Sequence, residues 1–188
     1  MGKKKICICV GHGRNAWGRY DPGAVSKDGS YHEHKIARKI AKYAADYLGC
    51  DLMNYDGRLC LSGRIKAVNA GNWDFVADIH LNAGGGTGTE VYYYHGSPTG
   101  KRAADEICKN ISQALGVRNR GAKVRLNSAG RDYFGFIRQT RPCAILVETV
   151  FIDSDSDLAK IKTEEGCKKC GIAIGKALEK ALNEGNAK

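Results

Sequence analysis

The sequence contains no apolar run near the roughly 18 residues that a membrane-spanning helix needs. It also has no internal repeat and no low-complexity block. A chain of 188 residues, 43% of them apolar, suits one compact domain whose core needs no disulfide staples. We therefore expect a soluble globular protein that does not insert into membranes.

A complete export signal is also lacking. Three lysines precede the apolar stretch Ile6–Val10, but a signal core needs about 7–15 apolar residues and a small-residue cleavage site. Position 6 is Ile where a myristoylation motif has Ser or Thr. We therefore expect the protein to be made and first kept in the cytoplasm.

The eight cysteines form no recognisable metal or redox motif. Cys7 and Cys9 alternate on one face of a predicted strand, and Cys143 opens an apolar run. Cys167 and Cys170 have a suggestive spacing, but no second Cys or His pair accompanies them. Because a cytosolic chain keeps its thiols reduced, we interpret the cysteines as small buried hydrophobes.

Acidic residues are too few to balance the basic ones, and the net charge is +10. Such an excess favours a polyanionic partner, for which nucleic acid, an anionic membrane face and wall teichoic acid all qualify. The sequence has no recognisable motif for reading nucleic acid. A non-catalytic basic binding module, with structural histidines, is therefore the weaker alternative to an enzyme.

Strand-like and helix-like segments alternate along the chain, which predicts an α/β fold with a mostly parallel sheet. The predicted strands are Ile6–Val10, Asp51–Tyr55, Phe75–Leu81, Thr89–His95, Phe134–Ile137 and Cys143–Val150. The predicted helices are Glu33–Leu48, Leu59–Ala70, Lys101–Leu115, Asp155–Ile161 and Glu164–Leu182. Residues 1–182 then form one domain, and residues 183–188 form a polar tail or the start of a linker.

Residues able to bind a metal or transfer a proton fall at the ends of three predicted strands. His12 follows the first strand by one glycine, His80 closes the third, and Glu148 lies near the end of the last. Parallel strands gather such residues at their carboxyl ends, and Glu33 begins a helix on the same side. Two imidazoles and a carboxylate are a common catalytic zinc set, and a second carboxylate can act as base and acid.

Each of these signals has a plainer interpretation when taken alone. A histidine at a strand end is more often hydrogen-bonded and structural than a ligand. Glu148 could pair with Arg138 or Arg141, because an unpaired carboxylate is costly to bury. It is the joint placement of four residues that favours a metal site.

Several ordered motifs, spread over about residues 5–180, resemble those of a known enzyme family. They are Val10–Gly13, Asp21–Ala24, Glu33, Arg64, Asn69, Asp78–Ala83, Gly88–Tyr93, Arg120–Lys123 and Val147–Ile152. The family is the zinc-dependent N-acetylmuramoyl-L-alanine amidases of the amidase-3 type. The resemblance implies a twisted sheet of about six strands flanked by helices, with Arg120–Lys123 in a loop after one strand.

The resemblance also implies roles for individual residues. His12, Glu33 and His80 would bind Zn²⁺, and Glu148 would be the catalytic carboxylate that activates water and protonates the departing L-alanine nitrogen. The substrate would be bacterial peptidoglycan. The sequence His32-Glu33-His34 leaves the ligand ambiguous, and we expect His32 and His34 to be solvated neighbours.

Two further features concern this chain in particular. Ile152-Asp153-Ser154 departs from the small residue and Asn that often follow in the family, which affects a turn more than the chemistry, and His95 is expected at the surface. No substrate-binding residue can be assigned, since Tyr92–Tyr94 and the Gly84–Gly88 loop could line a groove or serve packing.

A basic amidase domain without a leader resembles the catalytic part of a phage endolysin, and its charge would suit anionic wall polymers. A host autolysin or spore-lysis amidase is the close alternative. Another zinc hydrolase of the wall, which cuts within the stem peptide, is the alternative reaction.

Overall fold

A computed structural model describes residues 4–183 of the chain. Its strands are β1 (Ile6–Val10), β2 (Gly13–Arg14), β3 (Tyr20–Asp21), β4 (Asp51–Met53), β5 (Phe75–Asn82), β6 (Thr89–Tyr93), β7 (Asn119–Lys123) and β8 (Cys143–Phe151). Its helices are α1 (Glu33–Leu48), α2 (Leu61–Ala70), α3 (Pro98–Leu115), α4 (Gly135–Gln139), α5 (Asp155–Ile161) and α6 (Glu164–Asn183). Among these helices, none has the length and apolar character needed to cross a membrane.

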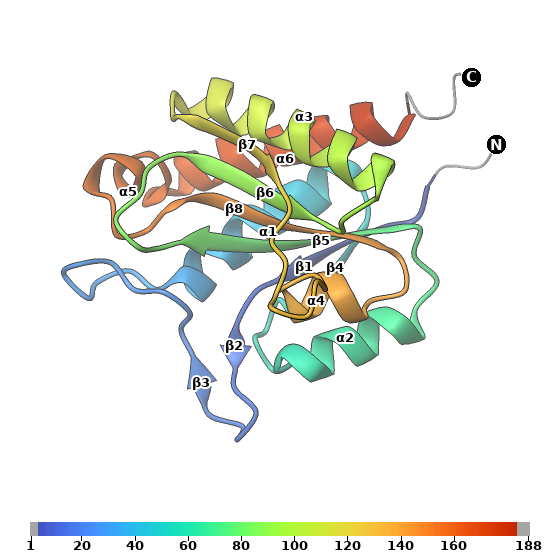
Figure 1. Cartoon of the computed structure of the whole chain (residues 1–188). Helices are drawn as coiled ribbons and strands as arrows, with labels where there is room; N and C mark the ends of the chain where they lie inside the picture. The colour runs from blue at the N-terminus through green and yellow to red at the C-terminus, as the bar shows by residue number, and fades with distance from the viewer. Residues whose placement is uncertain (1–3, 184–188) are drawn as a thin grey trace.

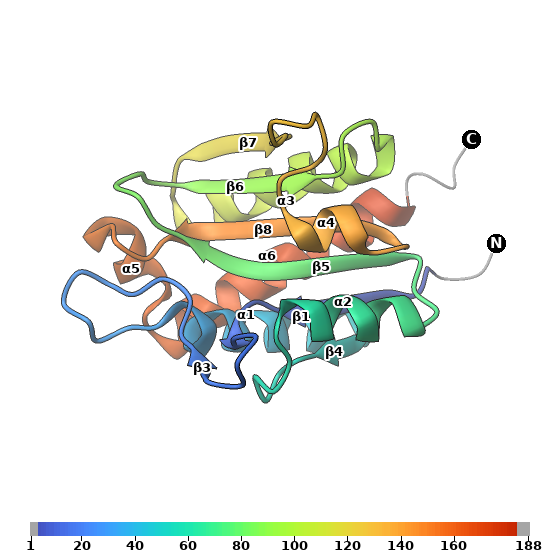
Figure 2. The ribbon, with the colours of Figure 1, turned by 60° about the horizontal axis from the view of Figure 1, so that its bottom comes forward.

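Six strands form one sheet in the order β4-β1-β5-β8-β6-β7. The strands from β4 to β8 in this order run parallel, while β6 pairs antiparallel with β8 and parallel with β7. Helices α1, α3 and α6 lie behind the sheet in Figure 2, and α2 and α4 lie in front. The predicted fold class, a mostly parallel sheet of about six strands flanked by helices, is confirmed.

Each face of the sheet has its own core. The larger core lies under α1, α3 and α6, where apolar residues recur every three or four positions along each helix, as Ile36, Ile40 and Ala44 do in α1. The smaller core lies under α2 and α4 and includes the side chains of Cys7 and Cys9. The cysteines of β1 are thus buried and free, as expected.

Helices α2 and α4 cover only part of their face of the sheet, which we call the α2–α4 face. In Figure 2 they lie over β1, β5 and β8, and only the segment leading from β7 to α4 crosses β6. In the same part of the molecule, β2 and β3 form a two-stranded hairpin that projects from the body in Figure 1. The α2–α4 face is therefore the less fully covered face of the sheet.

Several segments differ from the sequence-based expectation. Phe134 caps helix α4 and residues 135–137 begin it, where a strand was predicted over 134–137, because so short a run carries too little periodicity to separate helix from strand. Residues 119–123 form the edge strand β7, although Arg120–Lys123 was expected in a loop. Its mixed polar sequence follows from its place at the edge of the sheet.

The boundaries of several other elements also differ, including α2, β5, β6 and β8 by one or two residues. Helix α3 begins at Pro98, three residues before the prediction, because Ser97 Oγ accepts a hydrogen bond from the Gly100 N–H and proline suits the first helical position. Strand β4 is shorter than Asp51–Tyr55. Helix α6 extends to Asn183, and the rest of the predicted tail, 184–188, lies outside the described residues.

Candidate metal centre

The carboxyl ends of β1, β5 and β8 bring the predicted site residues to one edge of the sheet. Val10, two residues before His12, pairs with Ile79, and His80 pairs with Glu148. Helix α1 begins beside this edge with Glu33 in its first turn. The parallel arrangement on which the predicted convergence depended is therefore present.

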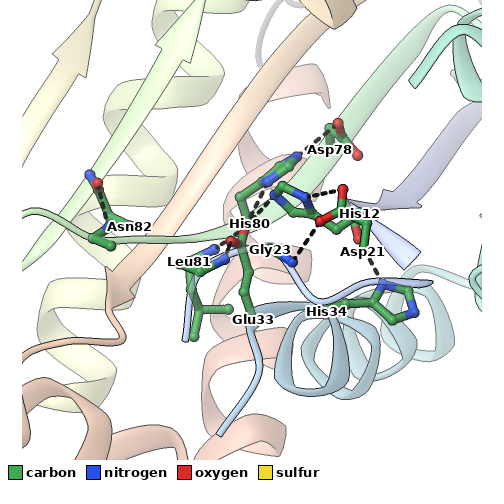
Figure 3. A network of polar contacts seen from close by, with 12 residues as sticks. His12, Asp21, Gly23, Glu33, His34, Asp78, His80, Leu81 and Asn82 are labelled. Atoms are coloured by element: carbon green, nitrogen blue, oxygen red, sulfur yellow. Dashed lines mark hydrogen bonds and ion pairs between the residues drawn. The ribbon is translucent and has the colours of Figure 1, made fainter. Parts of the chain in front are cut away.

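His12, Glu33 and His80 lie together in the structure (Figure 3). One ligand atom from each lies within 4.8 Å of the others. Glu33 Oε1 is 2.8 Å from His80 Nδ1 and 3.3 Å from His12 Nε2. A single carboxylate oxygen thus faces one nitrogen of each imidazole.

The other nitrogen of each imidazole faces an aspartate. His12 Nδ1 lies 2.9 Å from Asp21 Oδ2, and His80 Nε2 lies 3.0 Å from Asp78 Oδ2. Asp78 is fully buried beside the guanidinium of Arg64, which also donates a hydrogen bond to the His12 carbonyl. Carboxylates in such positions fix the orientation and tautomer of histidines that bind metals.

Glycines allow the backbone to approach these side chains closely. A Cβ on Gly11 would lie 2.3 Å from the His80 ring, and one on Gly23 would lie 2.4 Å from Glu33 Oε2. His12 itself has a left-handed backbone with φ of 57°, a conformation uncommon for residues other than glycine. At Gly11 and Gly23 a side chain would therefore collide with His80 or Glu33, so glycine is required at both positions for the cluster to form.

The electrostatics of this cluster favour positive charge. Burial alone would lower the pKa of His80, but Asp78 and Glu33 outweigh it and raise that pKa to about 10. Burial likewise opposes ionisation of Glu33, but hydrogen bonds from His12 and His80 hold its pKa well below the usual range. A divalent cation would supply the positive charge that these carboxylates favour.

The donor set fits zinc in its chemistry. Two imidazoles and one carboxylate, with an open fourth position, are typical of catalytic zinc sites. The aspartates behind both imidazoles supply the outer contacts that such sites have. His12, Glu33 and His80 are therefore the residues that could hold the ion.

Glu148 lies beside this cluster without a partner of its own. Its carboxylate is partly buried, and Oε2 is a buried oxygen with no hydrogen-bond partner within residues 4–183. Burial raises the pKa of Glu148 to about 7, and the neighbouring carboxylates Glu33 and Glu90 act in the same direction. Arg138 instead donates hydrogen bonds to the carbonyls of Asp132 and Tyr133, so the pairing considered for it is not found.

The histidines next to Glu33 differ from each other. The expectation that His34 is a solvated neighbour is wrong, because the residue is buried and its Nδ1 lies 2.7 Å from the Gly11 carbonyl oxygen. His34 is thus a structural support for the turn that carries His12. His32 is only partly buried and precedes α1, and His95 lies at the surface as expected.

Sequence reasoning gave no role to the two aspartates or to Arg64, although signals for them existed. Asp21 stands in one of the family-like motifs, and Asp78 is two residues before His80, which places both side chains on one face of β5. Arg64 lies within the predicted helix Leu59–Ala70, yet it is only 4% exposed. No periodicity within α2 could reveal that a buried aspartate on another element would receive it.

A cavity of about 240 Å³ adjoins the cluster on the α2–α4 face. Its lining includes His12, His80 and Arg14 together with the apolar side chains of Leu61 and Phe134. The predicted site therefore has an approach from solvent.

Comparisons with known proteins show the family to which the chain belongs. The profile of the Amidase_3 family, described as N-acetylmuramoyl-L-alanine amidase, matches residues 6–180. The sporulation-specific N-acetylmuramoyl-L-alanine amidase of Bacillus subtilis is 32% identical over 189 aligned positions, which cover 95% of this chain and 68% of that protein.

Solved structures show the same likeness. Cwp6 from Clostridium difficile superimposes with a TM-score of 0.86 at 33% identity, over 96% of this chain and 30% of that one. The catalytic domain of the CD27L endolysin, which targets Clostridia Difficile, gives a TM-score of 0.76 at 27% identity, over 95% of this chain and 98% of that one. The chain thus spans less than a third of Cwp6 but almost all of the endolysin domain.

Proposed function

Since this chain belongs to the Amidase_3 family of N-acetylmuramoyl-L-alanine amidases, we propose that it hydrolyses, with zinc as cofactor, the amide bond between N-acetylmuramic acid and L-alanine in bacterial peptidoglycan. The observation that carries this proposal is the juxtaposition of the His12–Glu33–His80 cluster with the unpartnered carboxylate of Glu148. Family membership supports the scissile bond, and the donor set supports the metal.

Zinc, when bound, would polarise the amide carbonyl and lower the pKa of water. The protein's own contribution at the reacting atoms is Glu148. A carboxylate whose pKa is near 7 can accept a proton at Oε2 from the attacking water and then donate it to the leaving nitrogen of L-alanine. A carbon–oxygen bond forms between the water oxygen and the amide carbonyl carbon, and the carbon–nitrogen bond breaks. The products are the free carboxyl group of muramic acid and the free amino group of L-alanine.

The surrounding residues act through orientation. Asp21 and Asp78 hold the rings of His12 and His80, and Arg64 holds Asp78. The N–H groups of Ala24 and Leu81 donate hydrogen bonds to the Glu33 carboxylate and fix its two oxygens. These hydrogen bonds fix the orientation of the cluster, which reduces the reorganisation that catalysis requires.

Chelation followed by product analysis tests the proposal. The protein should solubilise purified cell walls. After the protein is dialysed against a chelator it should leave the walls intact, and adding stoichiometric zinc to it should restore solubilisation. The newly released amino terminus should be L-alanine. A different new terminus would support cleavage within the stem peptide, and an intact wall together with absent zinc binding would support the non-catalytic binding module.

For the biological role, we propose lysis of the endolysin type, with the enzyme reaching the wall once the membrane is permeabilised. The likeness to the CD27L catalytic domain over nearly its full length supports this role. The likeness to the sporulation-specific amidase supports a second candidate, wall remodelling by a bacterial host. Added from outside, an endolysin should lyse vegetative Gram-positive cells, whereas a spore-specific enzyme should prefer spore peptidoglycan.

The net charge of +10 supports a role for anionic wall polymers in concentrating the enzyme on its substrate. Attraction of this kind weakens as salt rises, because the Debye length falls to about 8 Å at 0.15 M ionic strength. Lysis of walls that retain teichoic acid should therefore slow with added salt more than lysis of walls stripped of it. Equal salt dependence on both would contradict the electrostatic contribution.

A further inference from the structure

A second charged cluster lies next to Glu148, on the side away from the metal residues. We call it the Glu90 cluster, and it consists of Glu90, Arg120 and Lys123. In the sheet, Glu148 pairs with His80 on β5 and with Glu90 on β6, so the three side chains form one row across neighbouring strands. The proposed general acid thus stands between the metal cluster and the Glu90 cluster.

The carboxylate of Glu90 holds both cations in place. Its Oε2 accepts hydrogen bonds from Arg120 Nε and Lys123 Nζ, each at 2.5 Å. Its Oε1 accepts hydrogen bonds from Asn82 at 2.8 Å and from the Tyr92 hydroxyl at 2.9 Å. Asn82 and Tyr92 therefore hold the carboxylate of Glu90, and the carboxylate in turn fixes the guanidinium of Arg120 and the ammonium group of Lys123.

The two cations differ from Glu90 in being accessible. The Glu90 side chain is 4% exposed, whereas those of Arg120 and Lys123 are 26% and 33% exposed. Both come from β7, an edge strand over which neither α2 nor α4 lies in Figure 2. An ammonium group has three donors and a guanidinium five, so both can donate to a ligand while they remain bound to Glu90.

A third basic residue, Arg125, follows β7 in the chain. Arg125 stacks on the ring of Tyr133, with its guanidinium carbon 3.8 Å from the ring centre. Arg120, Lys123 and Arg125 together outnumber the single carboxylate of Glu90. The surface that leads away from Glu148 along β7 therefore favours an anionic ligand.

We propose that Arg120 and Lys123 bind a carboxylate of the stem peptide, carried by the residue that follows L-alanine. The inference rests on the proposed function, because Glu148 there protonates the leaving nitrogen and the peptide extends from that nitrogen. In the row His80–Glu148–Glu90 the Glu90 cluster lies beyond Glu148 as seen from the metal residues, and this is the side toward which we infer that the peptide extends. Glu90 acts as a positioning residue that fixes both cations.

The recognition would distinguish a carboxylate from a carboxamide. A carboxylate accepts charge-assisted hydrogen bonds from both cations, whereas a carboxamide offers only a neutral oxygen and brings donors of its own. Two soluble substrates test this directly, namely muramoyl peptides in which the carboxyl group of the residue after L-alanine is either free or amidated. We expect kcat/KM to be roughly 10–100-fold higher for the free carboxylate.

Lys123 is the better residue to change, because Arg120 also stacks on Phe151 and its loss would disturb packing. Lys123→Gln should reduce the ratio of kcat/KM values for the two substrates several-fold, chiefly through KM for the free carboxylate, while Arg120 retains the rest of the preference. Lys123→Arg should restore most of the ratio. Lys101→Gln, which removes an exposed lysine paired with Asp105 on α3, is the matched control and should keep the wild-type ratio.

The outcomes separate the inference from the proposed function. If the wild-type protein hydrolyses neither substrate at the muramoyl amide, the proposed function fails. If it hydrolyses both equally, or if Lys123→Gln leaves a marked preference unchanged while thermal unfolding shows an intact fold, the carboxylate site is overturned and the amidase activity stands.

Discussion

Glu33 and Glu90 are two buried glutamates that invite comparison, because each uses one oxygen to contact two basic side chains. Both residues are 3% exposed. Glu33 faces the imidazoles of His12 and His80, and Glu90 faces the guanidinium of Arg120 and the ammonium of Lys123. In both, burial opposes ionisation and the contacts outweigh it, so that the pKa of Glu90 falls to about 2 and that of Glu33 falls still further below its usual range.

The difference lies in what the basic partners can become. An imidazole can lose its proton and present a lone pair to a metal ion, and here the far side of each ring is held by an aspartate. A guanidinium has no lone pair to offer, and a lysine that donates to a carboxylate keeps its charge. Similar carboxylate geometry therefore yields a candidate metal site in one place and a cation pair for anionic ligands in the other.

The largest expected effect separates the two glutamates by metal content. Glu33→Gln removes a proposed ligand and should lower zinc affinity by more than the roughly 10–100-fold expected for loss of an outer contact. Activity on cell walls should be lost with the metal. Glu90→Gln is the matched change and should retain zinc, as measured by elemental analysis after gel filtration. Equal zinc content in the two variants would contradict the assignment of Glu33.

The next effect concerns Glu148, which stands between the two clusters. Glu148→Gln keeps the size of the side chain but can no longer accept or deliver the proton, so kcat should fall by about 10²–10⁴-fold, the usual contribution of general acid–base catalysis. Zinc content should stay at the wild-type level, because Glu148 is not among the three clustered ligands. Near-normal lysis by this variant would remove Glu148 from the chemistry.

The sequence predicted the residues gathered around Glu33 but not those of the Glu90 cluster. His12, His80 and Glu148 could be recognised because each lies at or just beyond the carboxyl end of a strongly apolar predicted strand, and parallel strands bring these ends together. Glu90 lies in a strand as well, but its partners come from β7, whose polar sequence resembles a loop. Because an edge strand is less buried, its sequence contains fewer apolar residues. The sequence therefore predicted neither β7 nor the Glu90 cluster, which β7 helps to form.

The helical elements show a similar division. Helix α1 was predicted with its observed bounds, because it buries a wide apolar stripe and ends at Gly49 in a left-handed conformation. Helix α4 was predicted as a strand, since its five residues form little more than one turn. The burial of His34 could not be foreseen either, because it depends on a carbonyl of Gly11 that only the folded turn brings near.

A smaller effect is expected from the aspartate behind His12. Asp21→Asn can keep the hydrogen bond that Oδ1 accepts from the Gly23 N–H, but its amide group would place a donor opposite His12 Nδ1. The preferred tautomer of His12 is then disfavoured, and zinc affinity should fall about 10–100-fold. Competition with a metal-binding dye measures this value. An unchanged affinity would show that Asp21 serves the β2–β3 hairpin alone.

The smallest expected effect is on stability, and it tests the ion pairs of Glu90 through the pH dependence of the free energy of unfolding. The pKa of Glu90 is about 2 in the folded protein, against about 4.3 in an unfolded chain. A depressed pKa stabilises the fold at pH values above the pKa of the unfolded chain, and this contribution declines as pH falls from about 4.3 toward 2.

Glu90→Gln should therefore lower the free energy of unfolding by about 1–3 kcal/mol at pH 7. Denaturant unfolding of both proteins between pH 7 and pH 3 should show this difference shrinking with acidity. A difference that stays constant over that range would mean that packing, and not the ion pairs to Arg120 and Lys123, is what Glu90 contributes.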